Sequence, residues 1–202
     1  MLSPATSALV VVDVQEAFRS HVHGFDDLVA QARLLVLAAT RLDVPVAVSE
    51  QYPSGLGSTV PELADVLPAG VEPFAKVEFA APLAAGWNEL PARVRDARQV
   101  VVVGIEAHVC IRQSVLALLE AGREVFVPVD AVGSRSALHR DVAIRELVRA
   151  GAHESTAEQV MFDWVRTAAA PEFRDLQRLV IDANRPPGAR IESGATGDRP
   201  RT

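Results

Sequence analysis

The chain has 202 residues, a net charge of −6 and a pI of about 5.4. Its 49% of hydrophobic residues and 23% of charged residues are ordinary for a globular domain, and the length suits one domain with a full core. The acidic balance and the scattered basic residues argue against a nucleic-acid partner.

No apolar run approaches the length of a membrane span, and the N-terminal residues lack the charged region and cleavage site of a signal peptide. The single cysteine permits no internal disulfide, so a reducing compartment suits the chain. We therefore expect a cytoplasmic protein with no membrane partner.

Short apolar runs alternate along the chain with segments of helical spacing. The runs predict strands at residues 8–14, 44–48, 74–76, 100–103, 124–129 and 153–155. The helical spacing predicts helices at 25–42, 81–95, from about 108 to 119, 136–150 and 171–181. Between them, residues 49–73 form a long segment rich in proline and glycine, with at most a short helix near 61–67.

Strands that alternate with helices imply right-handed crossovers and a parallel sheet covered on both faces. We expect one α/β domain over residues 1–182. From residue 183 the composition turns to Pro, Gly, Arg and Ser without periodicity, which predicts a disordered tail over 183–202.

Cys110 lies where the strand at 100–103 gives way to a helix. Free backbone N–H groups and the positive end of the helix dipole at such a position favour a thiolate. The same N–H groups can hold a developing oxyanion. Cys110 is therefore a candidate nucleophile.

Asp13 and Lys76 also lie at or just after the ends of predicted strands. Ligands bind at the carboxyl ends of parallel strands, so we expect Asp13, Lys76 and Cys110 to meet at one edge of the sheet. Each residue alone has an ordinary structural explanation, as a core thiol, a turn carboxylate or a solvated amine. Their predicted convergence favours a shared site.

These residue types suit cleavage of a C–N bond through a thioester. Asp13 would take the thiol proton and later deliver it to a leaving amine, while Lys76 would hold the carboxylate and favour both anions. Backbone N–H groups around residues 107–110 would bind the carbonyl oxygen, with Ala107 and Cys110 as the expected donors. Water would then release the acid.

The chain resembles the isochorismatase-like cysteine hydrolase superfamily over about its first 180 residues, most closely the isochorismatase-domain-containing subgroup. The matching segments are VVVDVQEAF at 10–18, SEQYPSGLGSTVPEL at 49–63, FAKVEFA at 74–80, VVVGIEAHVC at 101–110 and VDAVGSRS at 129–136, with further similarity over 151–179. The resemblance implies a catalytic triad of Asp13, Lys76 and Cys110, and a cis peptide bond between Glu106 and Ala107.

The expected fold is accordingly a three-layer α/β/α, Rossmann-like domain. Its parallel sheet would have about six strands in the order 3-2-1-4-5-6, with helices on both faces. Family members are commonly oligomeric, so the resemblance also implies a homo-oligomer. An apolar stretch near the C-terminus would either form the interface or cover the chain's own sheet; it contains Val160, Met161, Phe162, Trp164 and Val165.

The chain departs from the nicotinamidases, which carry an Asp and two His after the second strand as metal ligands. Its corresponding segment has no histidine, and His21 and His23 lack a completing ligand set, so we expect no metal and no cofactor. Candidate substrate-binding residues line the expected pocket: Phe18, Gln51, Tyr52, Phe79, Glu106 and His108. The two phenylalanines also suit the core, and His108 also suits a helix cap.

The favoured activity is a metal-independent cysteine hydrolase acting on a small amide, carbamoyl or related C–N compound. One alternative is hydrolysis of a vinyl ether, as in true isochorismatases, where the aspartate is a general acid and no nucleophile is needed. The other is a catalytically silent oligomeric binding protein with the same fold. Retention of Cys110 favours the first activity over vinyl ether hydrolysis, and the intact set of Asp13, Lys76 and Cys110 counts against a silent binding protein.

Overall fold

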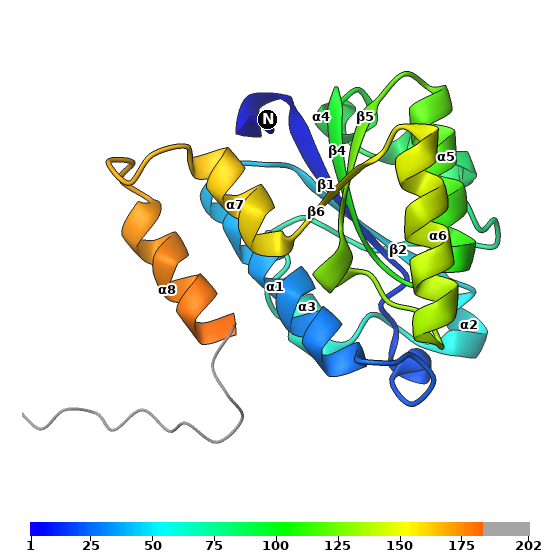
Figure 1. Cartoon of the computed structure of the whole chain (residues 1–202). Coiled ribbons are helices and arrows are strands. Elements are labelled where there is room, and N and C mark those ends of the chain that lie inside the picture. The colour runs from blue at the N-terminus through cyan, green and yellow to red at the C-terminus, as the bar shows by residue number, and fades with distance from the viewer. Residues whose placement is uncertain (184–202) are drawn as a thin grey trace, which may run out of the picture.

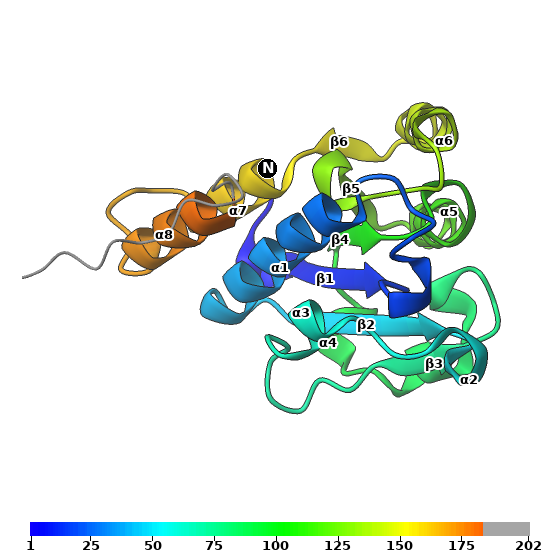
Figure 2. The ribbon, with the colours of Figure 1, turned by 90° about the horizontal axis from the view of Figure 1, so that it is seen from below.

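Six parallel strands form a single sheet in the computed structural model, which describes residues 1–183. Their order across the sheet is β3-β2-β1-β4-β5-β6, as predicted (Figure 2). The strands are β1 (Ser7–Val12), β2 (Val46–Gln51), β3 (Phe74–Lys76), β4 (Gln99–Gly104), β5 (Glu124–Pro128) and β6 (His153–Ser155). The fold class is thereby confirmed.

Helices cover both faces of this sheet. They are α1 (Phe25–Arg41), α2 (Pro53–Leu56), α3 (Pro61–Ala64), α4 (Ala92–Arg95), α5 (Arg112–Glu120), α6 (Ala137–Ala150), α7 (Ala157–Val165) and α8 (Phe173–Ala183). Figure 1 shows α1, α7 and α8 on one side of the strands and α5 and α6 on the other. The three-layer arrangement follows from this division.

The alternation of side chains along β1 shows how the sheet holds two cores. Leu9 and Val11 point into the core shared with α1, α7 and α8, while Val10 and Val12 point into the core shared with α5 and α6. All four side chains are buried, since a central parallel strand is covered on both faces. The unbroken apolar run in the sequence reflects this double burial.

The strand order reverses between β1 and β4, which pair along their whole length up to Val12 and Gly104. After β1 the chain crosses to α1 on one face, and after β4 it crosses to α5 on the other. The two connections therefore diverge at the carboxyl ends of these strands, which is the usual ligand position in such sheets.

The helix predicted over residues 81–95 is wrong for most of its length. The segment forms the 3-10 turns Ala81–Leu83 and Ala85–Glu89, followed by the four-residue α4. Pro82, Pro91 and Gly86 all lower helix propensity here. A Cβ on Gly86 would lie 2.9 Å from Cβ of Phe74, so the glycine allows this segment to approach β3 closely.

The long segment after β2 is ordered by two buried polar side chains. Gln15 donates to the carbonyl oxygens of Gln51 and Gly57 at 3.0 and 2.6 Å and accepts from the Gln51 N–H at 2.8 Å. The Glu50 carboxylate accepts from the Thr59 N–H and hydroxyl at 2.6 and 2.8 Å. These contacts hold the segment over the edge of the sheet where β1 and β2 end.

The apolar stretch near the C-terminus packs against the chain's own sheet, in α7. Val160, Met161, Trp164 and Val165 are buried in the core beside α1, and Phe162 alone is substantially exposed. The stretch therefore offers no separate argument for an interface. Ala183, the first residue of the predicted tail, ends α8, and residues 184–202 lie outside the described part of the chain. Within residues 1–183, no helix is both long and apolar enough to cross a membrane.

Candidate active site

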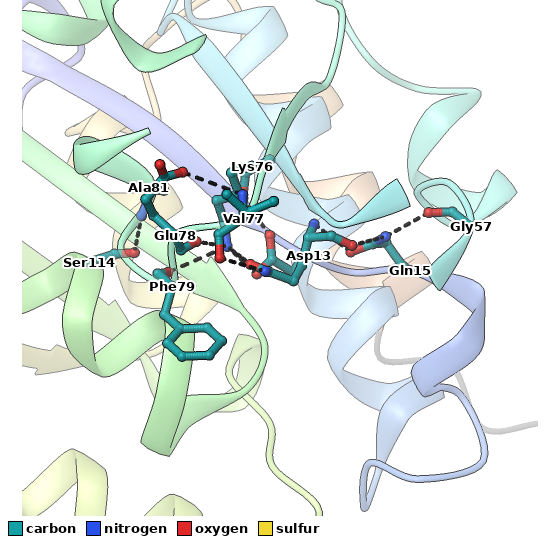
Figure 3. A network of polar contacts seen from close by, with 11 residues as sticks. Asp13, Gln15, Gly57, Lys76, Val77, Glu78, Phe79, Ala81 and Ser114 are labelled. Carbon is teal, nitrogen blue, oxygen red and sulfur yellow. Dashed lines mark hydrogen bonds and ion pairs between the residues drawn. The ribbon is translucent and has the colours of Figure 1, made fainter. Parts of the chain in front are cut away.

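The residues predicted to converge do meet at the end of the central strands. The Lys76 ammonium donates to the Asp13 carboxylate at 2.7 Å, and the two side chains are 0% and 2% exposed (Figure 3). The Cys110 thiol lies near both side chains, which act on its pKa in opposite directions. A thiol, a carboxylate and an ammonium group thus share one buried site.

The position of the Asp13 carboxylate is fixed by its backbone and by Ser49. Asp13 follows β1 with φ of 56°, a left-handed conformation that turns the chain out of the strand. Its N–H donates to the Ser49 carbonyl at 3.0 Å, and the Ser49 hydroxyl donates to Oδ1 at 2.7 Å. One carboxylate oxygen therefore binds Ser49 and the other binds Lys76.

The Lys76 ammonium is surrounded by oxygen acceptors. Besides Asp13, it donates to Gln51 Oε1 at 2.6 Å, the Glu78 carbonyl at 3.1 Å and the Phe79 carbonyl at 3.4 Å. Lys76 is also the only lysine in the chain, all other basic residues except the histidines being arginines. A compact ammonium fits a cage of this size, whereas a planar guanidinium does not.

Cys110 lies in the π-helical turn Ala107–Ile111 that leads into α5, and it is 7% exposed. Burial, and then the negative charge of Asp13, raise the pKa of Cys110 to about 12, against an opposing effect of Lys76. The resting thiol is therefore protonated at neutral pH. This corrects the expectation that the helix N-terminus would favour a thiolate, because burial and Asp13 outweigh it.

The connection from β4 to Cys110 differs from the expectation in two ways. The cis peptide bond joins Ile105 to Glu106, one residue earlier than predicted. The Ala107 N–H donates to the Gly133 carbonyl at 2.7 Å, so it is not available to a substrate oxygen. Ala107 is therefore wrong as an oxyanion donor, because the segment after β5 already occupies it.

Other N–H groups of the same turn remain available. Within residues 1–183, the N–H groups of Glu106, His108 and Cys110 donate to no backbone acceptor outside the turn Ala107–Ile111. The Cys110 N–H stays a predicted oxyanion donor, and the N–H of Glu106 or His108 is a candidate for the second. Backbone donors next to the thiol are what an acyl-transfer site requires.

Polar residues of the segment after β5 hold the side chains that precede Cys110. Arg135 binds the Glu106 carboxylate through Nε at 3.0 Å and a terminal nitrogen at 2.6 Å, and this pair holds the pKa of Glu106 below its usual value despite burial. The Ser134 hydroxyl lies 2.7 Å from His108 Nδ1, and the His108 ring stacks on His139. Burial lowers the pKa of His108.

The remaining predicted pocket residues lie in three different environments: Gln51 in the polar network, Tyr52 and Phe79 at the surface, and Phe18 against the core. Gln51 binds Lys76 and donates through Nε2 to the Val77 carbonyl at 3.0 Å. Tyr52 and Phe79 are exposed, and the Phe79 ring points away from the polar network (Figure 3). Phe18 is partly buried against the core beside α1, which favours the core interpretation.

Sequence reasoning missed Ser49, Ser134 and Arg135. Ser134 and Arg135 lie in the matching segment VDAVGSRS, so the resemblance carried a signal that was not assigned to individual residues. Ser49 directly follows the predicted strand at 44–48 and is the first residue of the matching segment SEQYPSGLGSTVPEL, so it carried the same unassigned signal.

No group of three or more His, Cys, Asp or Glu side chains in the described residues is arranged to hold a metal ion. His21 Nδ1 lies near the Ala17 carbonyl, at 3.1 Å, and the backbone N–H of His23 donates to the Ser134 carbonyl at 3.0 Å. Metal independence stays a prediction.

The fold and the site define a doubly wound α/β protein with a buried thiol at the strand switch point. The family model described as the Isochorismatase domain matches residues 7–159. The chain therefore belongs to the isochorismatase-like hydrolase family.

Curated relatives and a solved structure agree with this assignment. The chain is 42% identical over 177 residues to isochorismatase domain-containing protein 2 of Bos taurus, covering 88% of this chain and 84% of the relative. Isochorismatase domain-containing protein 1 of Danio rerio is 39% identical over 180 residues, which is 89% of this chain but only 62% of that protein. The solved structure described as MAR1 ribonuclease from Caenorhabditis elegans is 36% identical, with a TM-score of 0.84, and covers 100% of this chain and 98% of that chain.

Proposed function

We propose that the protein is a metal-independent cysteine hydrolase that cleaves a small amide, carbamoyl or related C–N compound. The observation that carries the proposal is the buried ion pair of Asp13 and Lys76 beside the Cys110 thiol. Burying two charges is costly, and replacing such a pair by apolar residues often stabilises a protein. A pair kept next to the only cysteine of the chain suits a chemical role.

In the proposed reaction the thiol proton moves to Asp13 as Cys110 Sγ attacks the carbonyl carbon. The N–H groups of Cys110 and of Glu106 or His108 receive the developing oxyanion. Asp13 then gives the proton to the leaving nitrogen, which departs as the C–N bond breaks and leaves a thioester. Asp13 next takes a proton from water, the hydroxide releases the carboxylic acid, and the proton returns to the thiol.

Lys76 makes the proton transfer feasible by stabilising whichever partner carries the negative charge. Its ammonium faces the carboxylate before transfer and also lowers the pKa of the thiol. Gln51 keeps the ammonium in place, and Tyr52, Phe79, Glu106 and His108 are the proposed substrate contacts. Since Cys110 is only 7% exposed, we expect the reacting group to be small.

A screen of small amides, ureas and carbamoyl compounds for release of ammonia or amine tests this function. We expect turnover by the wild-type chain and none by Cys110→Ala, because the thioester cannot form without the thiol. Mass spectrometry of the enzyme mixed with a turned-over substrate should show an acyl adduct on Cys110. If Cys110→Ala turned over substrate as fast as the wild type, Cys110 could not be the nucleophile.

We expect turnover to survive prolonged dialysis against EDTA. The prediction rests on the absence of a ligand set in the described residues and on chemistry that uses only the thiol, carboxylate and ammonium groups. The measurement is the rate of ammonia release before and after chelation. Loss of turnover that added zinc or iron restores would contradict metal independence.

The same screen also tests two other activities, hydrolysis of RNA and hydrolysis of a vinyl ether. The name of the Caenorhabditis elegans relative raises RNA hydrolysis as a second candidate, although a net charge of −6 is unfavourable for binding RNA. A labelled RNA and a vinyl ether belong in the screen, and cleavage of either that persists in Cys110→Ala would favour that activity over amide hydrolysis. Cytoplasmic location and homo-oligomeric assembly remain predictions from the sequence and the family resemblance.

A further inference from the structure

A cavity lies beside the candidate active site, between the beginnings of α1 and α6. It has a volume of about 320 Å³, at the lower end of the range for small-molecule sites, which begins at about 300 Å³. One wall comes from His23 and the first two turns of α1, and the other from the segment 129–140. Figure 1 shows α1 and α6 beginning at the same end of the sheet.

One wall of this cavity also supports the turn that carries Cys110. Gly133, which lines the cavity, accepts from the Ala107 N–H at 2.7 Å and donates to the Gly104 carbonyl at 3.1 Å. The neighbouring Ser134 also lines the cavity and lies 2.7 Å from His108 Nδ1. A ligand that moves this wall therefore acts directly on the residues preceding the nucleophile.

The cavity presents the Asp27 carboxylate on one wall and the Arg140 guanidinium, with Asp130 near it, on the other. Asp27, in the first turn of α1, is exposed and forms no hydrogen bond or ion pair with any described residue. Arg140 donates to the Val129 carbonyl at 2.7 Å, but its buried Nε has no partner and it forms no ion pair within residues 1–183. Neither Asp27 nor Arg140 therefore forms a salt bridge with a described residue, and each can pair with a ligand group of opposite charge.

Two other polar side chains of the cavity, Asp130 and Ser136, accept hydrogen bonds from backbone N–H groups. Asp130 accepts from the Ala157 N–H at 2.9 Å, and burial raises its pKa, while the charge of Arg140 acts in the opposite direction. The Ser136 hydroxyl accepts from the His139 N–H at the start of α6. The N-terminus of this 14-residue helix adds a positive potential on the same wall as Arg140.

We propose that this cavity binds a small zwitterion, such as an amino acid, and that its occupancy changes the reactivity of Cys110. The ligand ammonium pairs with Asp27, and its carboxylate pairs with Arg140 at the start of α6. A ligand with only one of the two charges leaves one wall without its partner. Gly133 and Ser134 line the cavity and also contact Ala107 and His108, so a ligand that shifts them also shifts the turn Ala107–Ile111.

Titration calorimetry on the full chain tests the binding, with glycine, β-alanine and γ-aminobutyrate as zwitterions of increasing length. We expect at least one to bind with a Kd below about 1 mM, and acetate and methylammonium to bind at least about tenfold more weakly because each makes one charged contact. Cys110→Ala should bind as tightly as the wild type, which separates this site from the proposed catalytic one. No saturable binding of any zwitterion, or equal binding of acetate, overturns the proposal.

Variants of the two charged residues test whether both walls of the cavity bind the ligand. Asp27→Asn and Arg140→Gln should each weaken binding at least about tenfold, and Asp27→Asn is the safer variant because its exposed side chain has no partner to lose. Arg145→Gln is the matched control, since Arg145 lies on α6 but outside this cavity. Unchanged binding in Asp27→Asn overturns the assignment.

The rate of Cys110 alkylation by iodoacetamide, measured with and without the tightest zwitterion, tests the coupling. We expect a several-fold change in the wild type and in Arg145→Gln, and none in Asp27→Asn at the same ligand concentration. Binding without any change in the wild-type alkylation rate overturns the coupling.

Discussion

Asparagine in place of Asp13 should sharply reduce turnover and yet make the Cys110 thiol easier to alkylate. The carboxylate is the largest influence after burial that raises the pKa of Cys110, and Lys76 opposes it. Removing the negative charge leaves the ammonium to favour the thiolate, so the pKa of Cys110 falls. Turnover should drop by a factor of about 10² to 10⁴, the usual loss for a missing general base.

The measurement is the rate of alkylation by iodoacetamide as a function of pH. A thiol with a pKa near 12 gives a wild-type rate that is still rising steeply at the alkaline end of the accessible range. In Asp13→Asn the whole profile should shift toward lower pH, each pKa unit corresponding to about 1.4 kcal/mol. Asp65→Asn, which removes an exposed carboxylate elsewhere, should leave both the profile and turnover unchanged. If Asp13→Asn also leaves the profile unchanged, the carboxylate does not act on the thiol.

The order of elements could be predicted because the central strands bury both faces. The continuous valine runs of β1 and β4 lack the polar face that a surface helix needs, so they indicate buried strands. The glycines at 122 and 151 mark where α5 and α6 end. The segment 81–95 could not be predicted in the same way. Its apolar spacing is helical, but the approach of Gly86 to Phe74 depends on a contact between separate elements.

The meeting of Asp13, Lys76 and Cys110 was predictable because a parallel sheet brings the carboxyl ends of its strands together. The properties of that site were less predictable. The thiol pKa depends on burial that the local sequence does not encode, and the expected donor Ala107 is occupied by Gly133, which is 26 positions away in the chain. Long-range contacts of single polar groups leave no periodic pattern.

The same reason explains why Ser49, Ser134 and Arg135 were missed. Each acts through one or a few side-chain contacts to a residue from another element: Ser49 to Asp13, Ser134 to His108 and Arg135 to Glu106. Glu106 was expected to contact substrate, but its carboxylate is already held by Arg135. A substrate that reaches this side of the site therefore meets a neutralised pair rather than a free carboxylate.

Methionine in place of Lys76 should be the most destabilising single substitution in the site. Methionine replaces most of the aliphatic chain but leaves the Asp13 carboxylate buried with Ser49 as its remaining side-chain donor. Breaking a buried ion pair on one side typically costs about 3–5 kcal/mol. The variant also loses the cation that opposes burial, so the pKa of Cys110 should rise further and alkylation should slow at every pH.

The free energy of unfolding in urea, measured for four chains, separates the contribution of the ion pair from that of lost packing. The four chains are the wild type, Asp13→Asn, Lys76→Met and the double variant. Because the double variant buries no unpaired charge, we expect it to be more stable than Lys76→Met alone. The coupling free energy of the cycle should reach about 0.5–3 kcal/mol, as for residues in direct contact. Additive losses would mean that the two charges do not stabilise each other. An alkylation profile of Lys76→Met identical to that of the wild type would place the ammonium outside the chemistry of Cys110.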